Sequence, residues 1–207
     1  MSIIPEAYRQ LILRQGEDFR WLQSMPSDAY DPRSGLDGDQ EDLHSDHGHI
    51  YRDCGIRRGL ITQQKRDALH PDLGWIHVGQ LWLTVMPDEV LLAPWDKIVL
   101  VERVQIENER LVRGVDQLGQ LYPVQVVVVA DSAAEYMQDV HWRYDSATRK
   151  LVWLSGGPTA GDVYSVRYEY RPMYWFLGGD YRSPRPVPGS DVQTPVKGLL
   201  SLVPPQA

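Results

Sequence analysis

The stretch Val163–Arg171 constrains the fold of this chain most, because apolar and polar side chains alternate along it. One face carries Tyr164, Val166, Tyr168 and Tyr170, and the other carries Val163, Ser165, Arg167, Glu169 and Arg171. A period of two with aromatic and β-branched residues is typical of a half-buried antiparallel strand. A second strand-like run, Leu151–Leu154, precedes it across a Gly/Pro turn, so the sequence predicts a β-hairpin over Leu151–Tyr174.

Other strand-like segments recur with turn signals roughly every ten residues, as in β-sandwiches and β-barrels. They are Ile56–Thr62, Trp75–Met86 with a break at Gly79, Lys97–Val104, a short hairpin of Val104–Glu107 with Glu109–Val112, Leu121–Ala130 and Val140–Tyr144. The nearly continuous apolar run Leu121–Ala130 predicts a strand buried on both faces. Near the N-terminus, Ala7–Arg14 follows Pro5 and predicts a short helix.

The fold class predicted from these segments is mainly β: an antiparallel β-barrel or sandwich with a long acidic loop and extended terminal arms. We expect an N-terminal arm over 1–25, an acidic loop insert rich in glycine and histidine over 26–53, and the β-body over 54–180. Residues 181–207 are rich in proline, which favours an extended arm. The apolar patch near its end, with Leu199 and Leu200, predicts docking on a neighbouring subunit, for example by strand addition.

Composition argues against several classes of function. The net charge is −7 over 207 residues, so no compact basic footprint for nucleic acid is expected. Cys54 is the only cysteine, which excludes an internal disulfide framework. No apolar run is long enough for a membrane span, and neither a phosphate-binding glycine loop nor a G-x-S-x-G elbow occurs. We therefore expect a soluble protein that has no cofactor and is not an enzyme.

The acidic insert raises one alternative, a small metal-dependent hydrolase. Imidazoles and carboxylates are ligands of zinc and related metals. The potential ligands lie close together in the sequence: Glu41, His44, Asp46, His47 and His49. The H-x-x-H-x-H spacing does not belong to a helix that would place two histidines on one face. A solvated loop without metal is the preferred interpretation, and the hydrolase stays an alternative.

The segment GGPTAGDVYSVRYEYRPMYW, Gly156–Trp175, resembles a segment of neck-region structural proteins of tailed bacteriophages, and Asp139–Gly157 and Leu121–Val129 fit the same pattern. The acidic insert has the frame of a cysteine-rich insert found in these proteins. Matching positions are Tyr30, Asp31, Gly48, Ile50 and Tyr51, whereas the cysteine positions hold Ser27, Ala29, Glu41 and His44. The zinc clip that those cysteines would form is therefore not expected here.

The resemblance implies a stopper or head-closure protein: a β-barrel subunit of a homo-oligomeric ring in the head-to-tail connector of the virion, made in the host cytoplasm. Its partners would be the portal or adaptor and the tail-terminator or tail-tube proteins, and the ring would enclose DNA without sequence-specific binding. Acidic residues would face the channel and repel phosphates, namely Asp37, Asp39, Glu41 and Asp42. Expected assembly contacts are Tyr164, Tyr168, Tyr174, Trp175, Leu199 and Leu200. A capsid decoration or tail-associated protein is the alternative within the structural class.

Overall fold

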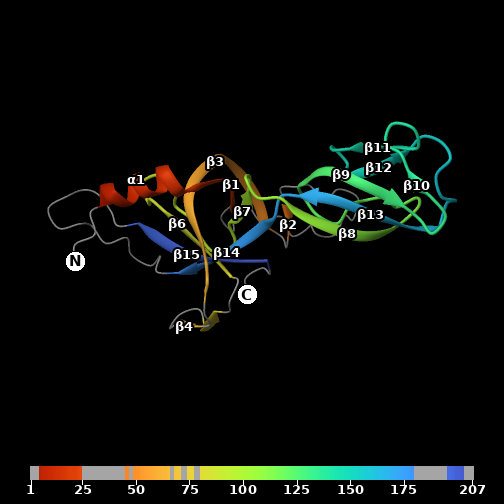
Figure 1. Ribbon diagram of the computed structural model, residues 1–207. Helices are drawn as coiled ribbons and strands as arrows, with labels where there is room; N and C mark the ends of the chain where they lie inside the picture. Colours follow the sequence, from red (N-terminus) through yellow and green to blue (C-terminus); the bar gives the residue numbers. More distant parts are fainter. Residues whose placement is uncertain are drawn as a thin grey trace. The chain divides into compact units, whose positions relative to one another are not determined.

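The computed structural model describes residues 5–24, 45–46, 49–65, 68–70, 74–76, 80–179 and 195–202 (Figure 1). The described chain is mainly antiparallel β-structure with one helix, which confirms the predicted fold class. It forms two compact units: unit 1 comprises Met1–Glu102 and Met173–Ala207, and unit 2 comprises Arg103–Pro172. Unit 2 is thus a single insertion within unit 1, and the β-body expected over 54–180 combines parts of both units.

Unit 1 is built around a closed β-barrel of six antiparallel strands. The ring order is β1–β7–β14–β15–β6–β3, and β3 pairs again with β1 to close it. The strands are β1 (Glu17–Ser24), β3 (His49–Gln63), β6 (Leu81–Val85), β7 (Lys97–Leu100), β14 (Met173–Gly179) and β15 (Val196–Ser201). The short β2 (Ser45–Asp46) pairs with β3, and β4 (Ala68–His70) pairs with β5 (Gly74–Ile76). Closure leaves no free sheet edge in the ring.

Apolar side chains fill the interior of the barrel, as expected for a barrel of few strands. The buried cluster includes Phe19, Trp21, Leu83, Val85, Ile98, Leu100, Phe176 and Leu200. Cys54 is partly buried and packs against this cluster. The barrel core therefore draws on strands from both ends of the chain.

Both predicted arms contribute strands to the barrel. The expected N-terminal arm contains α1 (Pro5–Gln15), which bears out the helix predicted over Ala7–Arg14, and then β1. Gly16 directly follows the helix: its N–H still bonds the carbonyl of Ile12, and a Cβ at this position would lie 2.3 Å from that oxygen. The apolar patch of the C-terminal arm lies in β15, which pairs with β14 and β6 of its own chain.

Unit 2 contains a four-stranded antiparallel sheet in the order β10–β9–β13–β8, so β13 lies between β9 and β8 (Figure 1). Its strands are β8 (Gln105–Val112), β9 (Pro123–Ala130), β10 (Glu135–Tyr136) and β13 (Val163–Tyr170), and β11 (Trp142–Asp145) pairs with β12 (Lys150–Trp153). The alternation predicted for β13 is confirmed, because Tyr164, Val166 and Tyr168 are buried in the core of unit 2. This core is separate from the barrel core.

Three predictions about strands in this region were wrong. The hairpin over Leu151–Tyr174 does not form, because β12 pairs with β11 and β13 lies between β8 and β9. The hairpin expected within 104–112 is one continuous strand, β8, since its full length pairs with β13. Strand β9 is not buried on both faces: Val126 and Val129 are buried, but Val124 and Val127 are exposed. The sheet of unit 2 has one packed face and one open face.

Candidate interaction surfaces

The residues predicted as assembly contacts are all buried within the single chain. Tyr164 and Tyr168 lie in the core of unit 2. Tyr174, Trp175, Leu199 and Leu200 are buried in β14 and β15 of the barrel. Their positions make them part of the cores of this chain, so a surface for partners has to be sought among other residues.

Most residues predicted for the acidic loop lie outside the described residues: Asp37, Asp39, Glu41, Asp42, His44 and His47. The two that are described, Asp46 in β2 and His49 in β3, are paired with each other. In the described part of the chain, no group of three or more His, Cys, Asp or Glu side chains is arranged to hold a metal ion. The metal hypothesis and the channel-facing role remain predictions.

A buried carboxylate, Asp116, organises the packed side of unit 2. It accepts hydrogen bonds from the Tyr164 hydroxyl at 2.6 Å, the Trp153 indole at 3.1 Å and the Gly114 N–H at 2.8 Å. The Arg113 guanidinium lies 3.1 Å from the same carboxylate and stands over the Trp153 ring. Burial alone would raise the pKa of Asp116, but these hydrogen bonds and the charge of Arg113 hold it below its ordinary value. Burial and the bond to Asp116 raise the pKa of Tyr164.

A second set of polar contacts supports the same sheet at β8. The Tyr168 hydroxyl donates to Glu109 at 3.0 Å and accepts from the backbone N–H of Gln120 at 3.2 Å. The N–H of Gly119 also donates to Glu109 at 3.0 Å. The Gln120 side chain lies 3.5 Å from Glu107, the next acidic residue on this face of β8. The segment around residue 120 is thereby fixed over the packed face of the sheet.

In unit 1, the fully buried Asp96 connects the start of β7 with β1. Its carboxylate accepts from the Trp21 indole at 2.8 Å, the Ser24 N–H at 2.8 Å and the Ala93 N–H at 3.0 Å. Burial raises the pKa of Asp96 to about 6, although the three donors favour the ionised form and limit the rise. No local sequence pattern points to this residue, because its partners on β1 are more than 70 positions away in the sequence.

The neighbouring Lys97 is buried among aromatic rings. Its Nζ lies 4.1 Å from the centroid of the Tyr51 ring and 4.6 Å from that of the Trp175 ring, both within the range of cation–π attraction. The Trp95 and Trp175 rings meet edge to face at 5.9 Å. These contacts join β7, β3 and β14 outside the apolar interior of the barrel. The buried Lys97 therefore stabilises the barrel through contacts within the chain.

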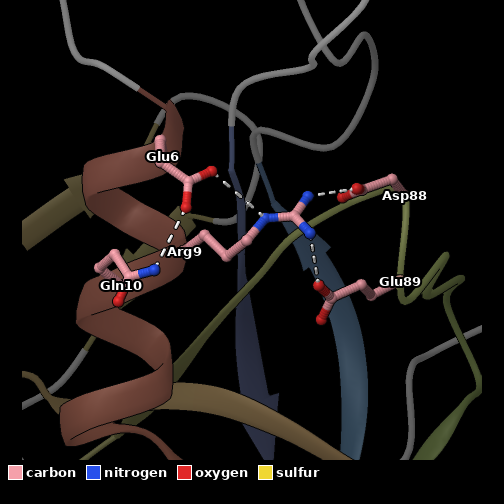
Figure 2. A network of polar contacts seen from close by, with 5 residues as sticks. All are labelled: Glu6, Arg9, Gln10, Asp88 and Glu89. Atoms are coloured by element: carbon pink, nitrogen blue, oxygen red, sulfur yellow. Dashed lines mark hydrogen bonds and ion pairs between the residues drawn. The ribbon is translucent and has the colours of Figure 1, made fainter.

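Helix α1 is attached to the turn after β6 through Arg9 (Figure 2). The guanidinium lies 2.5 Å from Asp88, 3.2 Å from Glu89 and 3.9 Å from Glu6, and Gln10 bonds the same Glu6. All these side chains are partly exposed, so solvent weakens the individual ion pairs. The network fixes the position of α1 and places no nucleophile beside a base.

Unit 2 carries many large apolar side chains that are exposed. Most of those exposed in the described residues belong to this unit: Val104, Ile106, Val112, Val115, Val124, Val127, Met137, Val140, Val152, Leu154 and Val163. On the open sheet face they are interspersed with the exposed Arg110 and Arg167. Clusters of exposed apolar residues rimmed by polar ones are typical of protein–protein contact sites.

The chain was compared with protein-family models and with curated proteins, and it matches none of them. In the described residues, no helix is long and apolar enough to cross a membrane. The surface of unit 2 is therefore the strongest structural indication of function on the described chain.

Proposed function

We propose that this protein is a structural protein of a tailed-phage virion, a subunit of a homo-oligomeric ring in the head-to-tail connector, of the stopper type. Support comes from the resemblance of Leu121–Val129, Asp139–Gly157 and Gly156–Trp175, together with the closed antiparallel barrel of unit 1, the architecture that the resemblance implies. The observation that carries the proposal is the apolar surface of unit 2. A lone soluble domain gains nothing from such a surface, whereas an assembling subunit uses it.

The two units suggest a division of labour within such a ring. The barrel has no free edge in its six-stranded ring and a filled interior, so it supplies a rigid body. Unit 2 offers an open sheet face whose valines, among them Val127 and Val163, can be covered by a neighbour. Subunits that repeat one such heterologous contact close into a ring when the rotation between them allows it.

Light scattering after size-exclusion chromatography, together with electron microscopy of the purified chain, tests the proposal. We expect closed rings, and we expect Val127→Asp to weaken assembly because it places a charge on the open face. Leu13→Asp is the matched control, since Leu13 is an exposed apolar residue on α1. A chain that stays monomeric at every concentration, or that Leu13→Asp disrupts as strongly as Val127→Asp, would contradict the proposal.

A further inference from the structure

Strand β8 forms one edge of the sheet in unit 2. Among the described residues it pairs only with β13, over its whole length from Gln105 to Val112. The side chains of Ile106, Asn108 and Arg110 are exposed. An eight-residue edge strand is long enough to accept another strand, which natural proteins usually prevent with short or covered edges.

The hydrogen bonds at the end of β8 show which backbone groups point outward. The N–H of Arg113 donates to Asp162, and its carbonyl accepts from Gly161, so both groups of Arg113 face the β13 side. Directions alternate along an antiparallel strand, so Ile106, Asn108 and Arg110 direct their N–H and carbonyl groups away from β13. The carbonyl of Val112 agrees with this assignment, because it accepts from the following turn rather than from β13.

The side chains of β8 give this edge a definite charge pattern. Glu107 and Glu109 share the packed face, and their contacts with residues 119 and 120 leave them partly exposed. Arg110 lies on the open face with Ile106 and Asn108. In an added antiparallel strand, residues directly opposite each other share a face, so unlike charges there are favourable and like charges are not.

This pattern disfavours a second copy of β8 as the occupant. A two-fold pairing centred on Asn108 would use all the outward backbone groups, but it would set Glu107 against Glu109 of the other copy. A two-fold axis at Glu107, at Glu109 or at Arg110 would place that residue opposite the same residue of the other copy. Every two-fold register that pairs five or more residues of β8 with the other copy thus opposes like charges across the new pair.

We propose that β8 accepts an extended segment of a different polypeptide, added as an antiparallel strand that carries basic residues opposite Glu107 and Glu109 and an acidic residue opposite Arg110. Main-chain bonds to Ile106, Asn108 and Arg110 supply attachment, and the charges select the partner and its register. The inference uses only the strand order and side chains of unit 2, so it is independent of the proposed ring.

A synthetic peptide tests this directly on the full chain. The probe is the capped peptide TEKTKVT, whose Glu, Lys, Thr, Lys and Val fall opposite residues 110 to 106 in the antiparallel register. We expect the amides of Ile106, Asn108 and Arg110 to exchange hydrogen rapidly in the free chain and slowly with the peptide, while the amide of Glu107 changes little. A matched peptide with both lysines replaced by glutamate should bind about tenfold more weakly.

Two variants make the test specific for the edge. Asn108→Pro removes an outward N–H at a place where an edge strand tolerates proline, and should abolish peptide binding, whereas Asn108→Ala should retain it. Glu107→Lys should reduce or reverse the preference for the lysine peptide, which keeps the proposal testable if Asn108→Pro does not fold. Any of three results would overturn the proposal. They are equal binding of both peptides, no protection of the amides from exchange by either peptide, and protection of the three amides already in the free chain. Light scattering on the same samples reports ring formation separately.

Discussion

Asp116 is the residue on which the packed side of unit 2 depends most clearly. Tyr164→Phe removes the shortest of its hydrogen bonds while keeping the buried ring, and leaves the carboxylate with fewer donors. We expect a loss of about 1–2 kcal/mol in the free energy of unfolding, measured by urea denaturation. Tyr170→Phe is the matched control, because the Tyr170 hydroxyl donates to Gln105 at an exposed site. Equal losses for the two variants would contradict the role given to Asp116.

Asp96 makes a prediction about pH. Its pKa rises from 3.8 to about 6 on folding, so between these values the folded chain holds a proton that the unfolded chain has released. The contribution of Asp96 to stability therefore increases as the pH falls from 7 towards 4.5, by on the order of 2 kcal/mol. Asp96→Asn should therefore reduce the change in stability between pH 7 and pH 4.5, as measured by thermal unfolding. This expectation holds whatever the variant does to the melting temperature at pH 7.

The control for that measurement is Asp139→Asn, which changes an exposed carboxylate of unit 2. Its curve should keep the slope of the original chain over the same range. The depressed pKa of Asp116 acts with the opposite sign, because stability from that group is lost only as the pH falls below its ordinary value of 3.8. The range from pH 7 to 4.5 thus separates the two carboxylates.

Sequence patterns reveal some of these residues and not others. The burial of Tyr164 and Tyr168 follows from strict alternation along a single strand, which is a local signal. Asp116 and Asp96 gain their roles from partners 48 and 75 positions away, Tyr164 and Trp21, and no local pattern reports such contacts. The one local signal is Lys97, a charged residue at the start of a strand that is otherwise apolar.

At the scale of elements, β14 and β15 fit together because Gly198 has no side chain. A Cβ at Gly198 would lie 2.0 Å from the ring of Phe176, a fully buried core residue. Gly198→Ala should therefore displace the ring and cost about 1–3 kcal/mol of stability, measured by denaturant unfolding. The double variant with Phe176→Leu should lose less than the sum of the two single losses, because the smaller side chain leaves room for the methyl group. Strict additivity would refute the steric explanation.

The positions of most strands could be predicted, but their partners could not. Leu151–Leu154 and Val163–Arg171 are close in the sequence and joined by a Gly/Pro turn, which favours a hairpin, yet β12 and β13 pair with other strands. Pairing is decided by which apolar faces can be buried together, and this depends on the whole chain. For the same reason the proline-rich arm concealed β15, whose burial requires β6 and β14.

At the scale of the whole molecule, unit 2 is inserted between two strands that are neighbours in the barrel, since Val99 of β7 pairs with Met173 of β14. Replacing residues 101–171 with an Asn-Gly turn keeps this register, and Pro172→Thr in the same chain restores the N–H that a tight β-hairpin needs opposite Leu100. We expect the shortened chain to fold as a barrel with cooperative thermal unfolding, and residues 103–172 alone to fold around their own core. Circular dichroism and calorimetry check both.

If the shortened chain stays unfolded while the 103–172 fragment folds, the barrel requires unit 2. The opposite result, a folded barrel and an unfolded 103–172 fragment, would show that unit 2 borrows stability from unit 1. Two folded products are the expected outcome, because each unit has its own buried apolar cluster.

The ring order of the barrel also sets the order of events during synthesis. When β7 leaves the ribosome, β7, β1, β3 and β6 can already pair, but the sheet they form has two open edges, because β14 and β15 fill the gap between β7 and β6. Those two strands emerge only after all of unit 2. The nascent chain therefore carries exposed pairing edges from the end of β7 at Leu100 until β15 ends at Ser201, while about one hundred further residues are made. Chains interrupted before Val196 should therefore aggregate, and the last strand to be made is the one that ends this exposure.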